Sequence, residues 1–292
     1  MQIFRAEVVR KAMRTPGMVR VTLGGNGLSE FSTTGVGDEY VRLFFATDGS
    51  GEPNLPRATG NGWSWEEGVE PAPLRTYTVR NARPDEGEID IDFVVHDGGV
   101  ASEWATRAQP GSTVGVNSPS GLYDAPDDLD WRILVADAAG LPAAARLLEQ
   151  SRPAVRTRVI LEVASRAHEQ SLTTTPDDDV AWLLGGNGKG PSRIAEIVRS
   201  IDLPDGVGYV WVAGETRELR SVRRYLRHEL GLPSSAYKVV GYWTYKGEEW
   251  LARYDSLDDT TKESLAAMWE DTERDEELIE DEYTARLESL GL

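Results

Sequence analysis

"LRTYTVRN", residues 74–81, places a cation, an aromatic ring and hydroxyl groups in a run whose alternation of side chains predicts a β-strand. In a regularly paired strand, Arg75 and Tyr77 point to one face, while Thr76 and Thr78 point to the other. Tyr and Thr are common in strands and Arg is often exposed, so an ordinary structural strand also explains the pattern. The flanking sequence distinguishes a binding strand from a structural one.

The first 126 residues predict an N-terminal antiparallel β-barrel domain. Short strand-like segments follow one another between Gly- and Pro-rich turns, and a single helix is expected at residues 100–109. The strand segments are FRAEVV, MVRVTL, YVRLFF, LRTYTV, EIDIDFVV and STVGVN. Residues 51–73 contain Gly, Pro, Asn and Trp without a period and are expected to form an ordered loop.

The pattern of predicted secondary structure changes after residue 127. Apolar strands now alternate with helical stretches, and the strands are WRILVA, VRTRVILEV, VAWLL, GYVWVA and AYKVVGYW. This alternation predicts a parallel sheet with both faces covered, so residues 127–250 are expected to form a Rossmann-like α/β domain. Ligands of such sheets bind at the carboxyl ends of the strands.

Residues 251–292 are expected to form an acidic, helical C-terminal extension. From Asp255 to Leu292 there are 14 acidic and 3 basic residues, which is −11 of the net charge of −18. Apolar residues spaced in threes and fours from Asp258 onward predict an amphipathic helix. Its acidic face is expected to be solvated, and a docking surface or a lid is the alternative.

The composition excludes several classes of function. A chain of 292 residues, 40% of them hydrophobic, can form two ordinary domains. The absence of cysteine excludes disulfides and iron–sulfur clusters, and the three scattered histidines argue against a metal site. The net charge of −18 argues against nucleic-acid binding. Without a secretory signal or a membrane-spanning run, a cytoplasmic protein with no membrane insertion is expected.

A second stretch, "HDGGVASEWA" at residues 96–105, directly follows the strand EIDIDFVV. Gly98 and Gly99 permit close backbone approach, and the helix that opens at Ala101 and Ser102 offers free amides to an anion. The plain alternative is a glycine turn with Ser102 as the helix cap. A strand, a glycine turn and a helix start together suit a pyrophosphate.

The two stretches together favour a flavin nucleotide. Arg75 supplies a fork for phosphate, Tyr77 a face for stacking, and Thr78 a hydroxyl for the ring heteroatoms. A third stretch, "GYWTYKG" at residues 241–247, ends the last predicted strand, where a cofactor ring would be approached. Core packing is the alternative explanation for Trp243.

Four stretches resemble the siderophore-interacting proteins, which are flavin-dependent ferric-siderophore reductases related to the ferredoxin–NADP reductases. They are R-x-Y-T at 75–78, DFVVHDGGVASEWA at 92–105, VWVAGE at 210–215 and GYW at 241–243. The resemblance covers roughly residues 2–247. It implies FAD on the barrel, NADPH or NADH on the second domain, and reduction of Fe(III) held by a siderophore. A ferredoxin-type protein is an alternative electron donor.

The resemblance also implies roles for individual residues. Arg75 holds phosphate; Tyr77 and Thr78 face the isoalloxazine; His96, Gly99, Ala101 and Ser102 surround the ribityl chain and the pyrophosphate; Asp137 lies near the adenine; Glu215 and Trp243 border the nicotinamide and the substrate. Tyr77, Thr78 and Trp243 are then the catalytic candidates.

This chain departs from the family pattern at two places. Ala138 and Ala139 replace the usual Glu-Thr after the acid, and Thr244 replaces the usual Arg after G-Y-W. Many siderophore complexes are anionic, so an acidic protein needs a local positive patch. Lys246, Arg42 and Arg80 are the candidates for substrate binding.

Three further motifs have ordinary structural explanations. "GGNGKG", residues 185–190, lacks the spacing of a phosphate-binding loop and is expected to be a flexible turn. The helix expected at residues 216–230 has four arginines on one face: Arg217, Arg220, Arg224 and Arg227. This face is expected to be solvated and paired with Glu218 and Glu229. Contact with a cofactor phosphate or with an acidic electron carrier is the alternative. In "VASRAHEQ", residues 163–170, Ser165 and Arg166 favour NADPH, while Glu169 favours NADH.

Two other functions remain alternatives. One is a general NAD(P)H-flavin reductase that serves a protein electron acceptor, which G-Y-W disfavours. The other is a non-enzymatic siderophore-binding protein whose flavin site has decayed, as Ala138 and Ala139 suggest.

Overall fold

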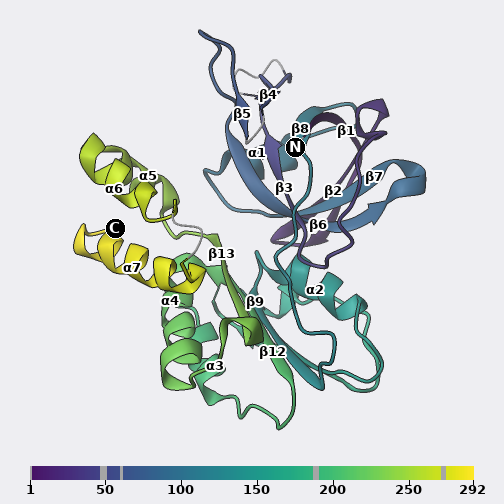
Figure 1. Cartoon of the computed structure of the whole chain (residues 1–292). Helices are drawn as coiled ribbons and strands as arrows, with labels where there is room; N and C mark the ends of the chain where they lie inside the picture. The colour runs from purple at the N-terminus through teal and green to yellow at the C-terminus, as the bar shows by residue number, and fades with distance from the viewer. Residues whose placement is uncertain (1, 47–50, 60–61, 187–190, 271–273) are drawn as a thin grey trace.

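The computed structural model describes residues 2–46, 51–59, 62–186, 191–270 and 274–292. Its N-terminal half is a closed antiparallel barrel with the strand order β1-β2-β7-β6-β3-β8 (Figure 1). The strands are β1 (Ile3–Thr15), β2 (Met18–Gly24), β3 (Tyr40–Phe44), β6 (Leu74–Arg83), β7 (Glu88–Val94) and β8 (Thr113–Asn117). Two short strands, β4 (Arg57–Ala58) and β5 (Trp63–Ser64), pair with each other in the segment expected to be a loop.

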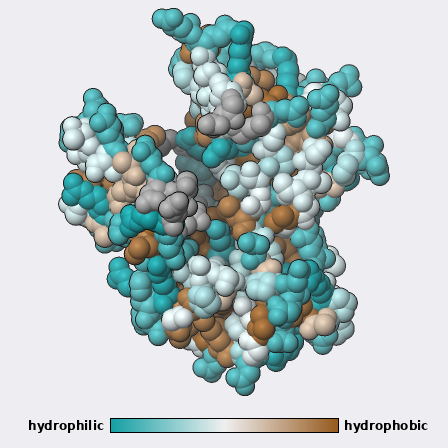
Figure 2. Space-filling model, viewed as in Figure 1, coloured by the Kyte–Doolittle hydropathy of each residue, from teal (hydrophilic) through white to brown (hydrophobic). Residues whose placement is uncertain are grey.

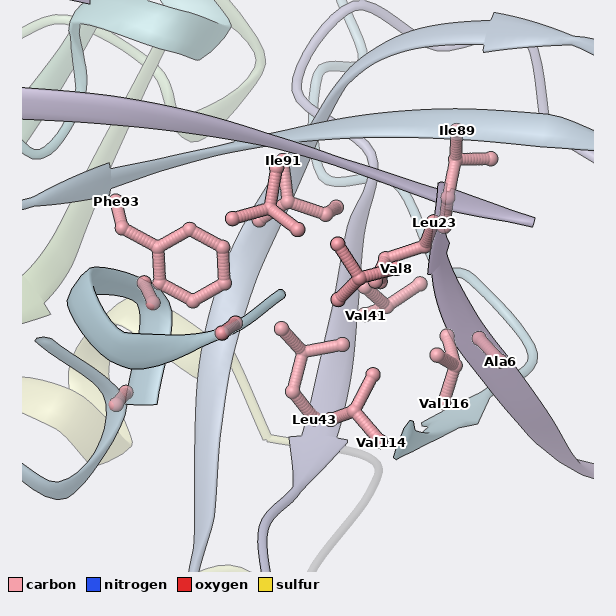
Figure 3. Close-up of a cluster of buried hydrophobic side chains, with 14 of the residues drawn as sticks. Ala6, Val8, Leu23, Val41, Leu43, Ile89, Ile91, Phe93, Val114 and Val116 are labelled. Carbon is pink, nitrogen blue, oxygen red and sulfur yellow. The ribbon is translucent and has the colours of Figure 1, made fainter. Parts of the chain in front are cut away.

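The barrel closes around alternate apolar side chains of its strands. Val8, Val41, Leu43, Ile91 and Phe93 point inward and are buried (Figure 3). Helix α1 (Val100–Arg107) covers one opening, where Trp104 packs against Phe93 with ring centroids 5.8 Å apart. The alternation in the sequence is therefore the inward and outward pattern of a small barrel.

The second half is a five-stranded parallel sheet with the order β11-β10-β9-β12-β13. Its strands are β9 (Trp131–Asp137), β10 (Arg156–Val163), β11 (Asp178–Leu184), β12 (Gly208–Glu215) and β13 (Tyr237–Trp243). Helix α2 (Leu141–Glu149) covers one face, and α3 (Ile194–Ser200) and α4 (Thr216–Arg224) cover the other, so the strands are buried on both sides. The predicted barrel and Rossmann-like sheet are both confirmed.

Buried polar contacts join the barrel to the sheet. Arg146 on α2 forms an ion pair of 2.8 Å with Glu39, and it also donates to the carbonyl oxygen of Val79. Asp38 accepts a hydrogen bond of 3.1 Å from the indole of Trp211 on β12. Figure 1 shows α2 between the two halves. These contacts fix the turn before β3 and the strand β6 to the sheet.

The C-terminal segment forms three helices where the sequence predicted one long amphipathic helix. They are α5 (Gly247–Asp255), α6 (Asp259–Ala267) and α7 (Glu276–Ser289). Leu265, Leu287 and Leu292 form a small core between them. The predicted start of the extension, residue 251, falls inside α5. Within the described ranges, no helix is long and apolar enough to cross a membrane.

The acidic face of this segment is not simply solvated, as the sequence had suggested. Three arginines form ion pairs with acids at residues 275–288, in and just before α7. They are Arg220 and Arg223 on α4 and Arg227 in the helical segment Tyr225–Glu229 that follows it. The expected acidic partners lie elsewhere. Glu229 pairs with Arg199 on α3, and the Glu218 side chain lies near the Glu215 carboxylate, where burial and the like charge raise its pKa. The tertiary contact between α4 and α7 therefore replaces the predicted local pairing.

Candidate functional site

Strand β6 carries the first group of candidate residues at the junction of barrel and sheet. Pairing aligns Thr78 with Tyr40 and Tyr77 with Val41, so Tyr77 turns towards the interior of the barrel. Its ring lies against Phe93 with centroids 4.4 Å apart, and burial raises the pKa of the Tyr77 phenol well above its ordinary value. Thr78 points the opposite way, towards the sheet.

Two buried hydroxyl groups face each other where β6 approaches β13. The Tyr242 phenol lies beside the Thr78 hydroxyl as a weak hydrogen-bonding neighbour, and among the described residues neither oxygen has any other hydrogen-bond partner. Burial, followed by the charge of Asp38, raises the pKa of Tyr242 well above its ordinary value, so the phenol is neutral. Buried polar groups are normally satisfied, so this pair indicates a site for a further polar partner.

Arg75 supplies an uncompensated positive charge on the same strand. Its side chain is exposed, and Nη1 donates to the carbonyl oxygen of Leu74 at 2.8 Å. In the part of the chain that the structure describes, Arg75 forms no ion pair. A guanidinium on the same strand as a neutral hydroxyl pair suits a ligand that is anionic in one part and polar in another.

The glycine turn before α1 is closed by Ser102. Its Oγ accepts the N–H of His96 at 2.9 Å and donates to the His96 carbonyl oxygen at 2.8 Å. Gly98 adopts a φ of 79°, and a Cβ on Gly99 would lie only 2.3 Å from the His96 ring. Ala101 is buried directly behind the turn. The backbone therefore forms a compact cradle at a helix N-terminus, which suits an anion.

Asp137 and Trp243 are joined at the carboxyl edge of the sheet. The sequence predicted Asp137 near the adenine and Trp243 near the nicotinamide, yet the Trp243 indole Nε1 donates to Asp137 Oδ2 at 2.5 Å. Asp137 Oδ1 accepts the backbone N–H groups of Ala139 and Gly140 at 2.8 and 3.2 Å. Burial raises the pKa of Asp137 to about 6, against the opposing effect of these hydrogen bonds.

Glu215 caps helix α4 at the same edge. Its Oε2 accepts the N–H groups of Arg217 and Glu218, which satisfies two free amides of the first turn. Its Oε1 accepts the N–H of Tyr245 at 2.9 Å and so fixes the chain that leaves β13. Glu215 thus has a structural partner for each oxygen, next to the position that the sequence assigned to nicotinamide.

The three predicted substrate-binding cations lie on separate elements with different partners. Arg42 on β3 lies over the Trp63 ring, 5.1 Å from its centroid, and forms no ion pair with any described residue. Arg80 forms a bidentate ion pair with Glu149, with contacts of 2.5 and 2.8 Å. Lys246 is exposed, has a left-handed φ of 54° and pairs with Glu249 at 3.1 Å. Arg42 is the cation with the least compensated charge of these three.

Sequence reasoning missed Tyr242 and Asp38. Tyr242 stands between Gly241 and Trp243 in a motif already singled out, and the alternation of a strand places it on the opposite side from Trp243. That alternation was an available signal for the residue that faces Thr78. For Asp38 there was no signal, because its partner Trp211 is 173 residues away.

The remaining expectations concern a turn and the dinucleotide. Of the turn "GGNGKG", residues 187–190 lie outside the described part of the chain. Arg166 is exposed and lies 3.8 Å from Glu169, and Ser165 Oγ lies 2.9 Å from His168 Nδ1. The groups expected to distinguish NADPH from NADH are therefore close together after β10.

The residues of the barrel edge fit a flavin dinucleotide. The Thr78 hydroxyl, which has only Tyr242 as a described neighbour, can bond a ring heteroatom, and the Arg75 guanidinium can bind phosphate. The turn at Gly99, packed against the His96 ring, presents the N-terminus of α1 to an anion. A barrel followed by a Rossmann-like sheet is the ferredoxin reductase-like fold.

Comparison with known proteins specifies the family. Residues 7–123 match the siderophore-interacting FAD-binding domain, and residues 129–246 match the siderophore-interacting protein domain. The NADPH-dependent ferric-chelate reductase of Escherichia coli is 33% identical over 82% of this chain and 92% of its own length. The ferric vibriobactin reductase of Vibrio cholerae is 30% identical over 81% of this chain and 88% of its own.

A solved structure supports the same relationship. The siderophore utilization protein from T. fusca superposes with a TM-score of 0.76 at 32% identity and covers 84% of this chain and 94% of its own. The chain belongs to the siderophore-interacting protein family.

Proposed function

We propose that this protein is an FAD-dependent reductase of ferric siderophores that takes its electrons from NADPH or NADH. The observation that carries the proposal is a pair of buried hydroxyls, Thr78 from the FAD-binding barrel and Tyr242 from the sheet, which have no partner but each other among the described residues. They lie where a flavin ring on the barrel would meet a nicotinamide on the sheet. The named activities of the Escherichia coli and Vibrio cholerae relatives support the same reaction.

The barrel residues would hold FAD at its pyrophosphate and at its isoalloxazine ring. Arg75 binds phosphate, and the turn from His96 to Ser102 receives the pyrophosphate at the α1 N-terminus. Thr78, which faces the sheet, would donate to or accept from a ring heteroatom of the isoalloxazine, and Tyr77 is the candidate for contact with the ring itself.

Bound flavin supplies the conversion of a two-electron donor into single electrons for iron, a step that side chains cannot perform. One NAD(P)H provides two electrons, so each turnover reduces two Fe(III) to two Fe(II) and yields NAD(P)⁺ and one proton. The protein orients the reactants and excludes water. Siderophore oxygens hold Fe(II) less tightly than Fe(III), so reduction loosens the metal. Because NAD(P)H is a cytoplasmic reductant, we place the reaction in the cytoplasm.

The sheet edge would receive the nicotinamide beside Trp243. Glu215 keeps the adjoining backbone in place, and Asp137, which binds Trp243, belongs on this side of the site. Arg166 is available for a 2′-phosphate, which favours NADPH.

The ferric siderophore would enter the hollow between the barrel and the α5–α6 pair, which Figure 2 shows as a depression in the surface. Arg42 supplies positive charge for an anionic complex, with Lys246 at the start of α5; Arg80 has its charge neutralised by Glu149 and contributes less. Steering of an anion by a few cations in an acidic protein depends on ionic strength.

An anaerobic experiment tests this function. FAD-loaded protein receives NADPH or NADH, then a ferric siderophore, while flavin absorbance and a colorimetric Fe(II) chelator are followed. Bleaching by a dinucleotide, recovery on addition of the siderophore and two Fe(II) per dinucleotide are expected. Bleaching by reduced ferredoxin alone would instead identify a protein donor. Recovery without Fe(II) would refute the substrate, and failure to bind FAD would support a non-enzymatic carrier.

Replacing Thr78 with Val tests the hydroxyl that carries the proposal. A hydrogen bond of about 1 kcal/mol corresponds to about a fivefold slower reduction of the flavin by the dinucleotide, with FAD still bound. Thr76→Val, an exposed neighbour on the same strand, is the matched control and should leave the rate unchanged. Equal rates in the two variants, measured by stopped-flow absorbance, would remove Thr78 from the site.

A further inference from the structure

The carboxylate of Asp137 is held rigidly at the end of β9. The side chain is 2% exposed, and two backbone N–H groups of the turn into α2 bind Oδ1. This fixes the plane of the carboxylate and leaves Oδ2 directed away from the turn. Asp137 can therefore act as a fixed acceptor for a group on another strand.

The bond from Trp243 to Asp137 crosses an intervening strand. In the sheet order β12 lies between β9 and β13, and Gly214 stands at the crossing. A Cβ on Gly214 would lie 3.1 Å from Asp137 Oδ2, closer than an ordinary contact. The absence of a side chain at Gly214 gives the carboxylate the room to reach the indole.

No cation compensates the buried charge. Among the described residues Asp137 has no ion pair, and the nearby carboxylate of Glu162 adds repulsion. Burying a carboxylate without a cation is unfavourable, and hydrogen bonds alone hold it ionised. An asparagine could accept the same two backbone bonds, but a carboxylate binds an indole N–H more strongly because the bond is charge-assisted.

The Trp243 backbone is fixed by other residues. Thr216 Oγ1 donates to the Trp243 carbonyl oxygen at 2.9 Å, and Glu215 holds the N–H of Tyr245. The part of Trp243 that depends on Asp137 is thus the orientation of the indole ring.

We propose that Asp137 is a positioning residue that fixes the Trp243 indole at the edge of the sheet, in the orientation that the nicotinamide requires. This inference rests on the proposed function for its catalytic consequence, whereas the contact itself can be tested without any cofactor. Ala138 and Ala139 leave the remaining surface of the turn small, and among the described residues the indole is the one side chain that binds the Asp137 carboxylate.

The surroundings of Asp137 define its pH dependence. Glu162 on β10 and Tyr242 on β13 are the ionisable groups that act on it, β12 presents Gly214, and α2 presents backbone amides. With a pKa of about 6, Asp137 is ionised above that pH and accepts the full bond; the bond weakens as the pH falls below it. Because the folded-state pKa is raised, the buried charge lowers stability at neutral pH, and this loss is relieved as the pH falls.

The contact is tested by ¹⁵N–¹H NMR of indole groups in the FAD-free protein, with the Trp243 signal assigned by Trp243→Phe. In the wild type this signal should shift with a midpoint near pH 6. In Asp137→Asn it should move upfield and stop titrating. A signal that is the same in both proteins and independent of pH would overturn the proposal, whether or not the protein reduces iron.

Kinetics and stability separate positioning from a structural role. Asp137→Asn should slow flavin reduction by the dinucleotide about tenfold, since a small misorientation of reactants is costly, while FAD affinity and the KM for the ferric siderophore stay within twofold. Its Tm should be unchanged or higher. A lower Tm with an unchanged rate would show a structural role and refute positioning.

Two variants complete the experiment. Glu196→Gln, which removes an exposed carboxylate from α3, is the control and should behave as wild type. In a Trp243→Phe background, Asp137→Asn should slow the rate no further, because the donor of the bond is already absent. Additive losses in this cycle would contradict the proposal. If Asp137→Asn does not fold, the pH titration of the wild-type indole still decides.

Discussion

Arginines on the barrel and arginines on helix α4 have different partners. Arg75 and Arg42 form no ion pair with any residue that the structure describes; one is exposed and the other lies over Trp63. Arg220, Arg223 and Arg227 instead face the acids of α7. In a chain with a net charge of −18, acids are plentiful. An arginine without an acid is therefore the better indicator of an external anion, whereas an arginine-rich helix is not.

Of the changes considered, removing the charge of Arg75 should have the largest effect, and this effect is on the affinity for FAD. Arg75→Met is expected to weaken FAD binding by about 10- to 100-fold, because a charge-assisted hydrogen bond contributes about 1.5–3 kcal/mol. Titration of the apoprotein with FAD, followed by quenching of flavin fluorescence, measures the Kd. Arg107→Met on α1 removes an exposed arginine paired with Glu103 and serves as the control. If both variants bind FAD equally well, the phosphate role of Arg75 is wrong.

Removing Arg223 should affect stability and leave FAD binding unchanged. Its guanidinium is half-enclosed by Glu277, Glu280 and the Val239 carbonyl, so Arg223→Met should lower the free energy of unfolding by about 2 kcal/mol. Chemical denaturation measures this loss, which should shrink in high salt. Arg217→Met, on the same helix but exposed, is the matched control. A loss of FAD affinity in Arg223→Met would contradict the distinction between barrel arginines that bind the cofactor and α4 arginines that pair with acids of α7.

The smallest effect is expected at Arg42. Arg42→Gln should raise the KM for an anionic ferric siderophore about three- to fivefold, in line with the modest energy of an exposed charge contact. A neutral ferric chelate should show no change, which separates charge from shape. Steady-state assays at low and high salt give the comparison. An equal rise for both chelates would indicate that Arg42 acts through packing on Trp63.

Periodicity was sufficient to predict the barrel and the parallel sheet, because each strand has its own local pattern. The contact of α4 with α7 was not predictable, since its ion pairs join residues about 50 positions apart. Sequence spacing indicated an amphipathic tail, but the breaks between α5, α6 and α7 depend on packing around Leu265 and Leu287. The domain boundaries at residues 126 and 250 stay predictions.

Motifs predicted which stretches carry the candidate residues, whose roles stay predictions, but not how those residues contact each other. Four candidates could be singled out from short stretches, because the chemistry of each can be inferred from one strand or turn: Arg75, Thr78, Ser102 and Trp243. The Asp137–Trp243 bond joins residues 106 positions apart and depends on the strand order and on Gly214. Arg80 was attractive as a free cation because Glu149, its partner, lies on a different domain.

The contacts of Arg146 with Glu39 and of Asp38 with Trp211 have a consequence for substrate size. A hinge motion of the barrel against the sheet would expose a buried ion pair, so the two halves behave as a single rigid frame. The barrel wall of the hollow beside α5 is thereby held in a fixed position relative to the sheet. We expect this wall to limit the bulk of the iron chelates that the proposed site admits.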